Sequence, residues 1–321
     1  MHPPGVPDRI RLGVSACLLG EPVRFDAGHK HDRFLTDVLG RHVEWVAVCP
    51  EVEIGLGVPR ETLRLVGMPG APRLVQPKTG EDLTARMQRY AGDRVRALAE
   101  LNLDGYVLKR ASPTCGLFRV RVYRESGVPA ADGRGVFADA LVRALPALPV
   151  EEEGRLTDPA IRENFIERVF ASARWRGFVA TRPRPRDLVA FHTAHKLAVL
   201  AHSPAHYARL GRLAAAAGRA FTRAKLDEYH ALLFEAFAVR ATRGRHANVL
   251  THMAGYVKRD IAPDERAELV ELIDEYRRGL VPLVVPLTLV RHHVRRLGVG
   301  YLADQVYLNP HPRELMLRNH V

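Results

Sequence analysis

The chain has 321 residues and a formal net charge of +12, and its 47% hydrophobic and 26% charged content is ordinary for a globular protein with room for two cores. No apolar run reaches the roughly 18 residues of a membrane-spanning helix, and the N-terminal MHPPGVPDRI lacks the features of a signal peptide. We therefore expect a cytoplasmic protein without a membrane partner.

The first half of the chain alternates between strand and helix patterns. Short apolar runs rich in β-branched and aromatic residues predict strands at 10–16, 43–48 and 104–109. Apolar residues three and four apart predict helices over 81–102 and 134–145. Strands separated by helices favour an α/β fold, with a mostly parallel sheet that carries helices on its faces.

The second half is predicted to be almost entirely helical. Prolines and an acidic run at 146–160 indicate a domain boundary, so we expect an α/β domain over 1–155 and an all-α domain over 156–321. The basic segment 181–186 is expected to be a stiff connector, and prolines within 281–298 are expected to kink or break a helix there. Further helices are predicted over 158–176, 187–202, 204–218, 225–239 and 263–279.

Three cysteines are the only ones in the chain, and each follows one of the predicted strands. Cys17 comes after 10–16, Cys49 after 43–48, and Cys115 a few residues after 104–109. An odd number of thiols in a reducing compartment argues against structural disulfides. Because the carboxyl ends of parallel strands share one edge of the sheet, we expect the three cysteines to meet at one site.

Three thiolates leave one coordination position of a metal centre free, as catalysis requires. The residues alone leave two such centres open: a zinc ion with a bound water, and an iron–sulfur cluster with one open iron. No CxxC pair is present to decide between them. A third alternative has no metal, with three buried cysteines packed as small apolar side chains.

The sequence around each cysteine resembles a known family. VSACLLGEPVRFDAGHK, VCPEVEIGLGVPRE and LKRASPTCG resemble the thiouracil desulfidase (TudS-like) domain in content, order and spacing. Downstream, KLAVLAHSPAHYARLGRLAA, NVLTHMAGYVKR and YRRGLVPLVVPLTLVRHHV are similar to the YbgA-type domain. Together the two domains cover almost the whole chain, and their fusion resembles the bacterial tRNA 4-thiouridine desulfidases (RudS-like).

The resemblance implies an oxygen-sensitive 4Fe-4S cluster held by Cys17, Cys49 and Cys115, whose unligated iron takes up the thiocarbonyl sulfur. It also implies catalytic roles for Glu51 and Ser112. Glu51 is suited to deprotonate a water molecule, and Ser112 to hydrogen-bond the base or relay a proton. The alternatives are structural: a first-turn acid for Glu51, and a loop cap before proline for Ser112.

The loop after the first cysteine offers polar side chains for a substrate pocket, namely Arg24, Asp26, His29 and Lys30. The alternative is a turn, which Asp26 and Gly28 favour equally well. Glu53 and Arg60 also lie in a matched motif, but the sequence does not indicate their roles.

Most of the excess positive charge is local. Residues 182–259 contain 14 basic and 4 acidic residues, which suits a polyanion such as RNA. Tyr256 could stack on a base. The basic residues expected to contact phosphates are Arg240, Arg243, Arg245, Lys258 and Arg259. The alternative is an arginine-rich composition that reflects a GC-rich or thermophilic source.

Four histidines cluster within this region, at His192, His195, His202 and His206. Their spacing could face a metal, but no carboxylate lies among them to complete a zinc motif, so we expect surface or hydrogen-bonded histidines.

We thus predict a tRNA 4-thiouridine desulfidase that converts 4-thiouridine in tRNA to uridine and sulfide without electron transfer, and that needs no obligate protein partner. One alternative is a desulfidase of free thiolated bases such as 2-thiouracil. A second, from another class, is a non-enzymatic RNA-binding or sulfur-carrier protein.

Overall fold

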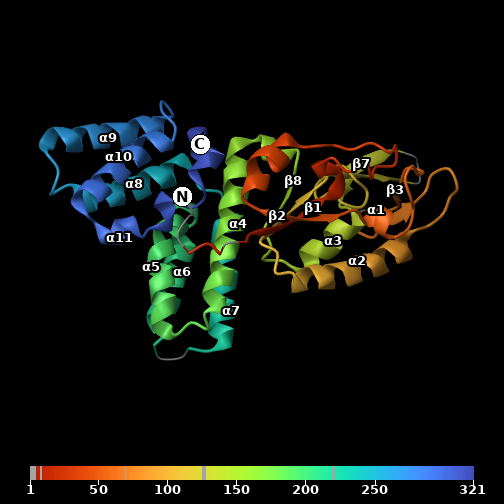
Figure 1. Cartoon of the computed structure of the whole chain (residues 1–321), viewed down its shortest axis with the longest axis horizontal. Coiled ribbons are helices and arrows are strands. Elements are labelled where there is room, and N and C mark those ends of the chain that lie inside the picture. The colour runs from red at the N-terminus through yellow and green to blue at the C-terminus, as the bar shows by residue number, and fades with distance from the viewer. Residues whose placement is uncertain (1–4, 8, 69, 125–127, 219–220) are drawn as a thin grey trace. The chain divides into compact units, whose positions relative to one another are not determined.

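The computed structural model describes the chain except for residues 1–4, 8, 69, 125–127 and 219–220 (Figure 1). It forms two compact units, Asp8–Thr157 and Asp158–Val321, and the second also takes in the described residues that precede Asp8. No helix in the described ranges is both long and apolar enough to cross a membrane.

The first unit is built on a parallel sheet of four strands in the order β2-β1-β5-β8. Its strands are β1 (Arg11–Ser15), β2 (Glu44–Val48), β5 (Gly105–Leu108) and β8 (Val150–Glu152). In the central strand, Val14 pairs with Ala47 of β2 and with Val107 of β5. The three strands predicted from apolar runs are therefore confirmed. Because they are parallel, their C-terminal ends lie at one edge.

Two helices, α2 (Thr84–Glu100) and α3 (Val136–Ala144), lie side by side against this sheet (Figure 1). Val95 of α2 and Phe137 of α3 share a buried cluster with Tyr106 of β5. Gly13 of β1 makes room for that tyrosine, because a Cβ atom there would lie 2.1 Å from its ring. Both predicted helices are confirmed.

A second, mixed sheet in the order β4-β3-β6-β7 was not predicted. Its strands are β3 (Arg64–Val66), β4 (Arg73–Val75), β6 (Val120–Tyr123) and β7 (Pro129–Gly133), and a short helix, α1 (Pro50–Glu53), follows β2. Strands of three to five residues are too short to show a reliable alternation of apolar and polar side chains. β8 was missed for the same reason.

The second unit is helical, as predicted. Its helices are α4 (Pro159–Ala180), α5 (Pro185–His202), α6 (Pro204–Ala216), α7 (Arg223–Ala238), α8 (Arg243–Val257), α9 (Pro263–Arg278), α10 (Val284–Leu297) and α11 (Gly300–Ala303). α8 was not predicted as a helix. The prediction that prolines break the helix within 281–298 is wrong. Pro282 precedes α10 and Pro286 lies in its first turn, where a missing N–H costs no helical hydrogen bond.

Short 3₁₀ and π segments complete the chain: η1 (Ala16–Leu19), η2 (Phe34–Val38), η3 (Leu39–Arg41), η4 (Arg155–Thr157), η5 (Val306–Leu308), η6 (Arg313–Leu315) and η7 (Leu317–Asn319).

Candidate active site

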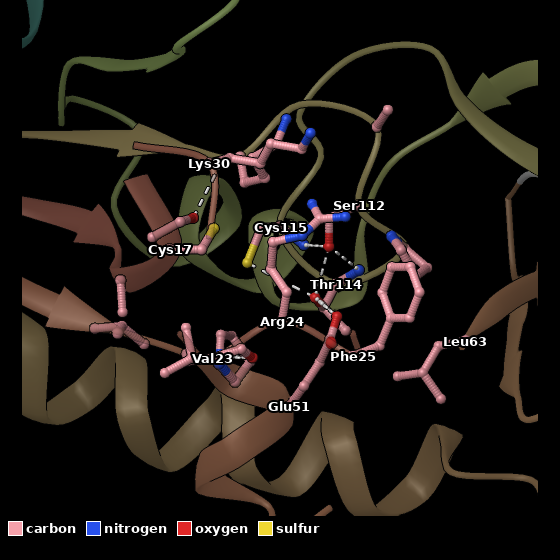
Figure 2. Close-up of a pocket in the computed structure, with 18 of the residues that line it drawn as sticks. Cys17, Val23, Arg24, Phe25, Lys30, Glu51, Leu63, Ser112, Thr114 and Cys115 are labelled. Carbon is pink, nitrogen blue, oxygen red and sulfur yellow. Dashed lines mark hydrogen bonds between the residues drawn. The ribbon is translucent and has the colours of Figure 1, made fainter. Parts of the chain in front are cut away.

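A cavity of about 380 Å³ lies at the C-terminal edge of the parallel sheet (Figure 2). The last residues of β1 and β2, Ser15 and Val48, are part of its wall. The predicted site residues among its lining are Cys17, Cys49, Cys115, Glu51, Ser112, Arg24 and Lys30. The structure therefore brings together side chains that are up to about a hundred residues apart in the sequence.

Each cysteine is placed by the way its strand ends. Cys17 lies in η1, which follows β1 directly, and Cys49 immediately precedes Pro50, the first residue of α1. Cys115 lies in the loop after β5. Cys17 and Cys115 are buried, with exposed fractions of 8% and 6%, and Cys49 is half-buried.

The loop that carries Cys115 is held by its own serine and by α3. The Ser112 hydroxyl oxygen accepts hydrogen bonds from the backbone N–H of Thr114 (3.2 Å) and of Cys115 (3.1 Å). The N–H of Phe137, in the first turn of α3, donates to the Thr114 carbonyl (3.0 Å). Gly135 permits this approach, because a Cβ atom there would lie 2.4 Å from the same carbonyl oxygen. The loop conformation thus depends on backbone contacts.

Acidic residues at the end of β8 hold the same loop from the other side. Glu152 accepts hydrogen bonds from the N–H of Leu117 (2.7 Å), and Glu153 from the N–H of Arg110 (2.7 Å). Glu153 also forms an ion pair with Lys109. The acidic run that the sequence suggested as a boundary feature is therefore part of the scaffold of the site.

A row of hydrogen-bonded side chains runs beside the Cys115 sulfur (Figure 2). The Thr114 hydroxyl donates to Glu51 Oε1 (2.8 Å) and lies 2.9 Å from the Ser112 hydroxyl. The other carboxylate oxygen of Glu51 accepts from the guanidinium of Arg60, which also donates to the Val23 carbonyl (2.9 Å). Glu51 is thus fixed in orientation and joined through Thr114 to Ser112.

The pKa of each of the three thiols lies above its ordinary value, so the thiols are protonated in the absence of a metal centre. Burial, followed by the nearby Cys49, raises the pKa of Cys17 to about 11. Burial also raises the pKa of Cys49 and of Cys115. A positively charged metal centre would reverse this balance, because it stabilises thiolates and displaces their protons.

Three cysteines around one cavity supply the thiolate ligands that iron–sulfur clusters take. In such a cluster the cysteines bind different irons. Among the described residues, no three His, Cys, Asp or Glu side chains are grouped closely enough to hold one metal ion.

Of the four loop residues proposed for the pocket, Arg24 and Lys30 line it and the other two do not. Asp26 is exposed and makes the alternative turn, since its carboxylate accepts from the N–H of Gly28 (3.1 Å) and from Arg24 Nε (3.3 Å). His29 is exposed and accepts from the N–H of His31 (3.3 Å). The structure therefore gives Asp26 and His29 local roles in the loop.

Sequence reasoning missed Thr114 and left two other residues without a role. Thr114 occupies the unspecified position of the Ser-Pro-x-Cys motif, so only the fold shows that it links Ser112 to Glu51. Arg60 orients Glu51. Glu53 helps to position Cys49, because its carboxylate accepts hydrogen bonds from the Cys49 N–H (3.2 Å) and the Tyr90 hydroxyl (2.7 Å).

The five basic residues proposed for RNA do not form one group. Arg240 and Arg243 lie at the N-terminal end of α8, whereas Lys258 and Arg259 follow its C-terminal end, about 22 Å away along a helix of 15 residues. Arg245 is partly buried, and its guanidinium donates to the His202 carbonyl at the end of α5 (2.7 Å). Arg245 therefore joins two helices, and the other four are exposed.

The four clustered histidines are hydrogen-bonded within the second unit. Only His206 is not buried. Their partners are the Tyr229 hydroxyl for His192, the Phe191 carbonyl for His195, Glu167 and the Val239 carbonyl for His202, and the Ser203 hydroxyl for His206.

Comparison with known proteins divides the chain into two parts, in the order that the sequence motifs indicate. The family model for 2-thiouracil desulfurase matches residues 12–153, and that for a protein of unknown function (DUF1722) matches residues 196–312. The uncharacterized protein YbgA of Escherichia coli (strain K12) is 35% identical over 136 residues, which are 41% of this chain and 79% of YbgA. The uncharacterized protein YbbK of Bacillus subtilis (strain 168) is 29% identical over 108 residues, 32% of this chain and 71% of YbbK.

Among solved structures, the 4Fe-4S-dependent thiouracil desulfidase TudS is 34% identical to this chain. The match covers 46% of this chain and 93% of TudS, with a TM-score of 0.38. The sequence identities and the two family models agree with the motifs around the cysteines and in the helical unit. The chain therefore joins a domain of the 2-thiouracil desulfurase family to a YbgA-type domain.

Proposed function

We propose that the chain is a tRNA 4-thiouridine desulfidase, in which Cys17, Cys49 and Cys115 bind a 4Fe-4S cluster. The observation that carries the proposal is the shared cavity, where three cysteines from three strand ends meet the row Glu51–Thr114–Ser112. TudS is described as 4Fe-4S-dependent, and its match to this chain covers 93% of TudS.

The reaction needs proton transfer but no electrons. One water molecule replaces the sulfur of a thiocarbonyl by oxygen and releases hydrogen sulfide, so two protons move from oxygen to sulfur. When bound, the cluster supplies an iron without a protein ligand, a Lewis acid with affinity for sulfur.

The side chains of the cavity can manage those protons. Glu51 accepts a proton from the attacking water, because its carboxylate is held in place by Arg60 and keeps a lone pair on Oε1 beyond its bond to Thr114. Thr114 and Ser112 can then pass a proton along the row to the sulfide that leaves. The apolar residues Val23, Phe25 and Leu63 also line the cavity.

The substrate is proposed to be a base within tRNA, extruded from its stack into the cavity. A cavity of about 380 Å³ is in the range of small-ligand pockets, so it takes a base but no folded RNA. The excess of basic residues over 182–259 supports contacts to phosphates by the helical domain 156–321, while the domain 1–155 carries the chemistry.

A free thiolated base is the second candidate substrate, because the matching family model is described by 2-thiouracil. The two are separated by anaerobic reconstitution followed by parallel assays of 4-thiouridine-containing tRNA and of free 4-thiouridine and 2-thiouracil. We expect a much higher kcat/KM for tRNA, with an advantage that shrinks as salt is added. Turnover of the free bases with none on tRNA would overturn the proposed substrate and leave the desulfidase chemistry intact.

A further inference from the structure

The second unit contains a separate cavity of about 450 Å³, formed by α10 and the C-terminal segment 310–319. Its lining includes the polar residues Arg291, His311, Arg313, Glu314, Arg318 and Asn319. Nothing in the desulfidase chemistry uses it.

Arg291 brings a positive charge to this cavity. Its guanidinium donates to the Leu308 carbonyl, but its Nε atom is buried with no hydrogen-bond partner among the described residues. Burial, then the nearby charges of Arg318, Arg313 and Arg295, lower the pKa of Arg291 to about 10. The three nearby charges that lower this pKa are cations, whereas Tyr307 acts in the opposite direction.

Arg318 differs, because its charge is balanced inside the core. It donates to Glu163 (3.0 Å) and to the Tyr307 carbonyl (2.6 Å), and it lies 3.7 Å from Glu167. Both glutamates belong to α4 and are buried. Arg318 thus anchors the C-terminal segment, and the other charged residues of the lining are Arg291, the exposed Arg313 and one carboxylate, Glu314.

His311 adds a hydrogen-bond acceptor to these donors. It is 5% exposed and lines the cavity. Its Nδ1 donates to the Pro312 carbonyl (3.2 Å), so in the neutral ring Nε2 carries no proton and is a hydrogen-bond acceptor. That Nε2 is buried with no partner in the described part of the chain. Burial, then the charge of Arg318, lowers the pKa of His311 to about 3, so the ring is neutral.

We propose that this cavity binds a phosphate group that still carries a proton, as inorganic phosphate does at neutral pH and a phosphomonoester does near or below its second pKa of about 6. Arginine N–H groups bind the anionic oxygens, and a protonated phosphate oxygen donates to His311 Nε2. Sulfate has the same shape but no proton at neutral pH, so it cannot make the second contact. The group can come from the end of an RNA chain or from a small phosphate compound. This proposal does not rest on the desulfidase activity.

The test is isothermal titration calorimetry of the full chain with inorganic phosphate and, in parallel, with sulfate. We expect phosphate to bind and sulfate to bind at least tenfold more weakly. Arg313→Gln should weaken phosphate binding about ten- to hundredfold, as expected for one charge-assisted hydrogen bond. Arg266→Gln is the matched control, because Arg266 is an exposed arginine of α9 outside the cavity lining.

A short RNA with a 5′-phosphate and the same RNA with a 5′-hydroxyl distinguish the two sources when they are compared at pH 6, where about half of a terminal phosphate carries the proton. Preference for the phosphorylated RNA assigns the site to an RNA end, and equal binding of the two RNAs assigns it to a small phosphate compound. Because Arg313 is exposed, its variant should fold, which circular dichroism checks. Absence of phosphate binding by the wild-type chain, equal affinity for sulfate, or equal losses in the two variants would each overturn the proposal.

Discussion

Replacing Thr114 by valine tests whether the hydroxyl row of the active site carries protons. Thr114 is 1% exposed, and its hydroxyl lies 2.8 Å from Glu51 Oε1 and 2.9 Å from Ser112 Oγ. Valine keeps the shape of the side chain but removes the only hydroxyl between the two. The change breaks the row and also removes the contact of the hydroxyl with the Cys115 sulfur (3.7 Å), so the iron and sulfide content of the variant is measured as well.

The expected loss follows from the bond that disappears. A hydrogen bond to a charged group contributes about 1.5–3 kcal/mol. If that bond holds Glu51 in the transition state, its loss lowers kcat about ten- to hundredfold. The assay is the rate at which the thiouridine absorbance of saturating tRNA disappears, normalised to the iron and sulfide content of each preparation.

Thr114→Ser is the matched control, because it retains the hydroxyl and should keep kcat within a few-fold of the wild type. A role for the row is excluded if Thr114→Val with a full cluster turns over at the wild-type rate. It is excluded equally if the serine variant is as slow as the valine variant, since the hydroxyl would then be irrelevant.

Other side chains of the two units can be tested in the same way. Replacing any one of the three cysteines by alanine should abolish stable iron loading. If one variant keeps full iron and full activity, the cysteine replaced in it is not a cluster ligand. Glu51→Gln should retain the cluster, measured by its visible absorbance, and lose turnover about 10²–10⁴-fold, as for a lost general base; near-normal turnover would make Glu51 structural. Replacing Arg240 and Arg243 by Gln should reduce the slope of log tRNA affinity against log salt by about 0.7–0.9 for each phosphate that is no longer bound, whereas an unchanged slope would place the RNA surface elsewhere. Burial lowers the pKa of His202, but Glu167 outweighs burial, so the pKa in the folded chain lies above the unfolded pKa of about 6.5. The charged histidine therefore stabilises the fold below about pH 6.5, and this stability should be lost as the pH rises through the folded pKa. Thermal unfolding should show the decline, and His202→Gln should flatten it.

The convergence of the cysteines could be predicted because it depends on topology alone. Apolar runs identified β1, β2 and β5, and once these strands are parallel the residues that follow them must share an edge. The same argument placed Glu51 beside Cys49. Periodicity likewise predicted α2 and most helices of the second unit, since long amphipathic segments carry many matching positions.

Features that depend on residues distant in sequence could not be predicted in this way. Thr114 acquires its link to Glu51 only when α1, which follows β2, meets the loop after β5, and the two residues are 63 positions apart. The acidic residues after Val150 look like a solvated run, but Glu152 is buried because it binds backbone N–H groups of the Cys115 loop. Arg245 resembles its exposed neighbours in sequence, yet it packs between helices.

The proposed reaction replaces the sulfur of a base in tRNA by oxygen from water, and it requires the cluster-loaded chain. A single labelling experiment follows both atoms: the anaerobically reconstituted protein is incubated with 4-thiouridine-containing tRNA in ¹⁸O-labelled water, and released sulfide and the mass of the product nucleoside are measured. We expect one sulfide for each thiouridine consumed, and uridine that carries the heavy oxygen. Sulfur retained on the protein, uridine without the label, or no loss of thiouridine from tRNA by fully loaded protein would contradict the proposed reaction.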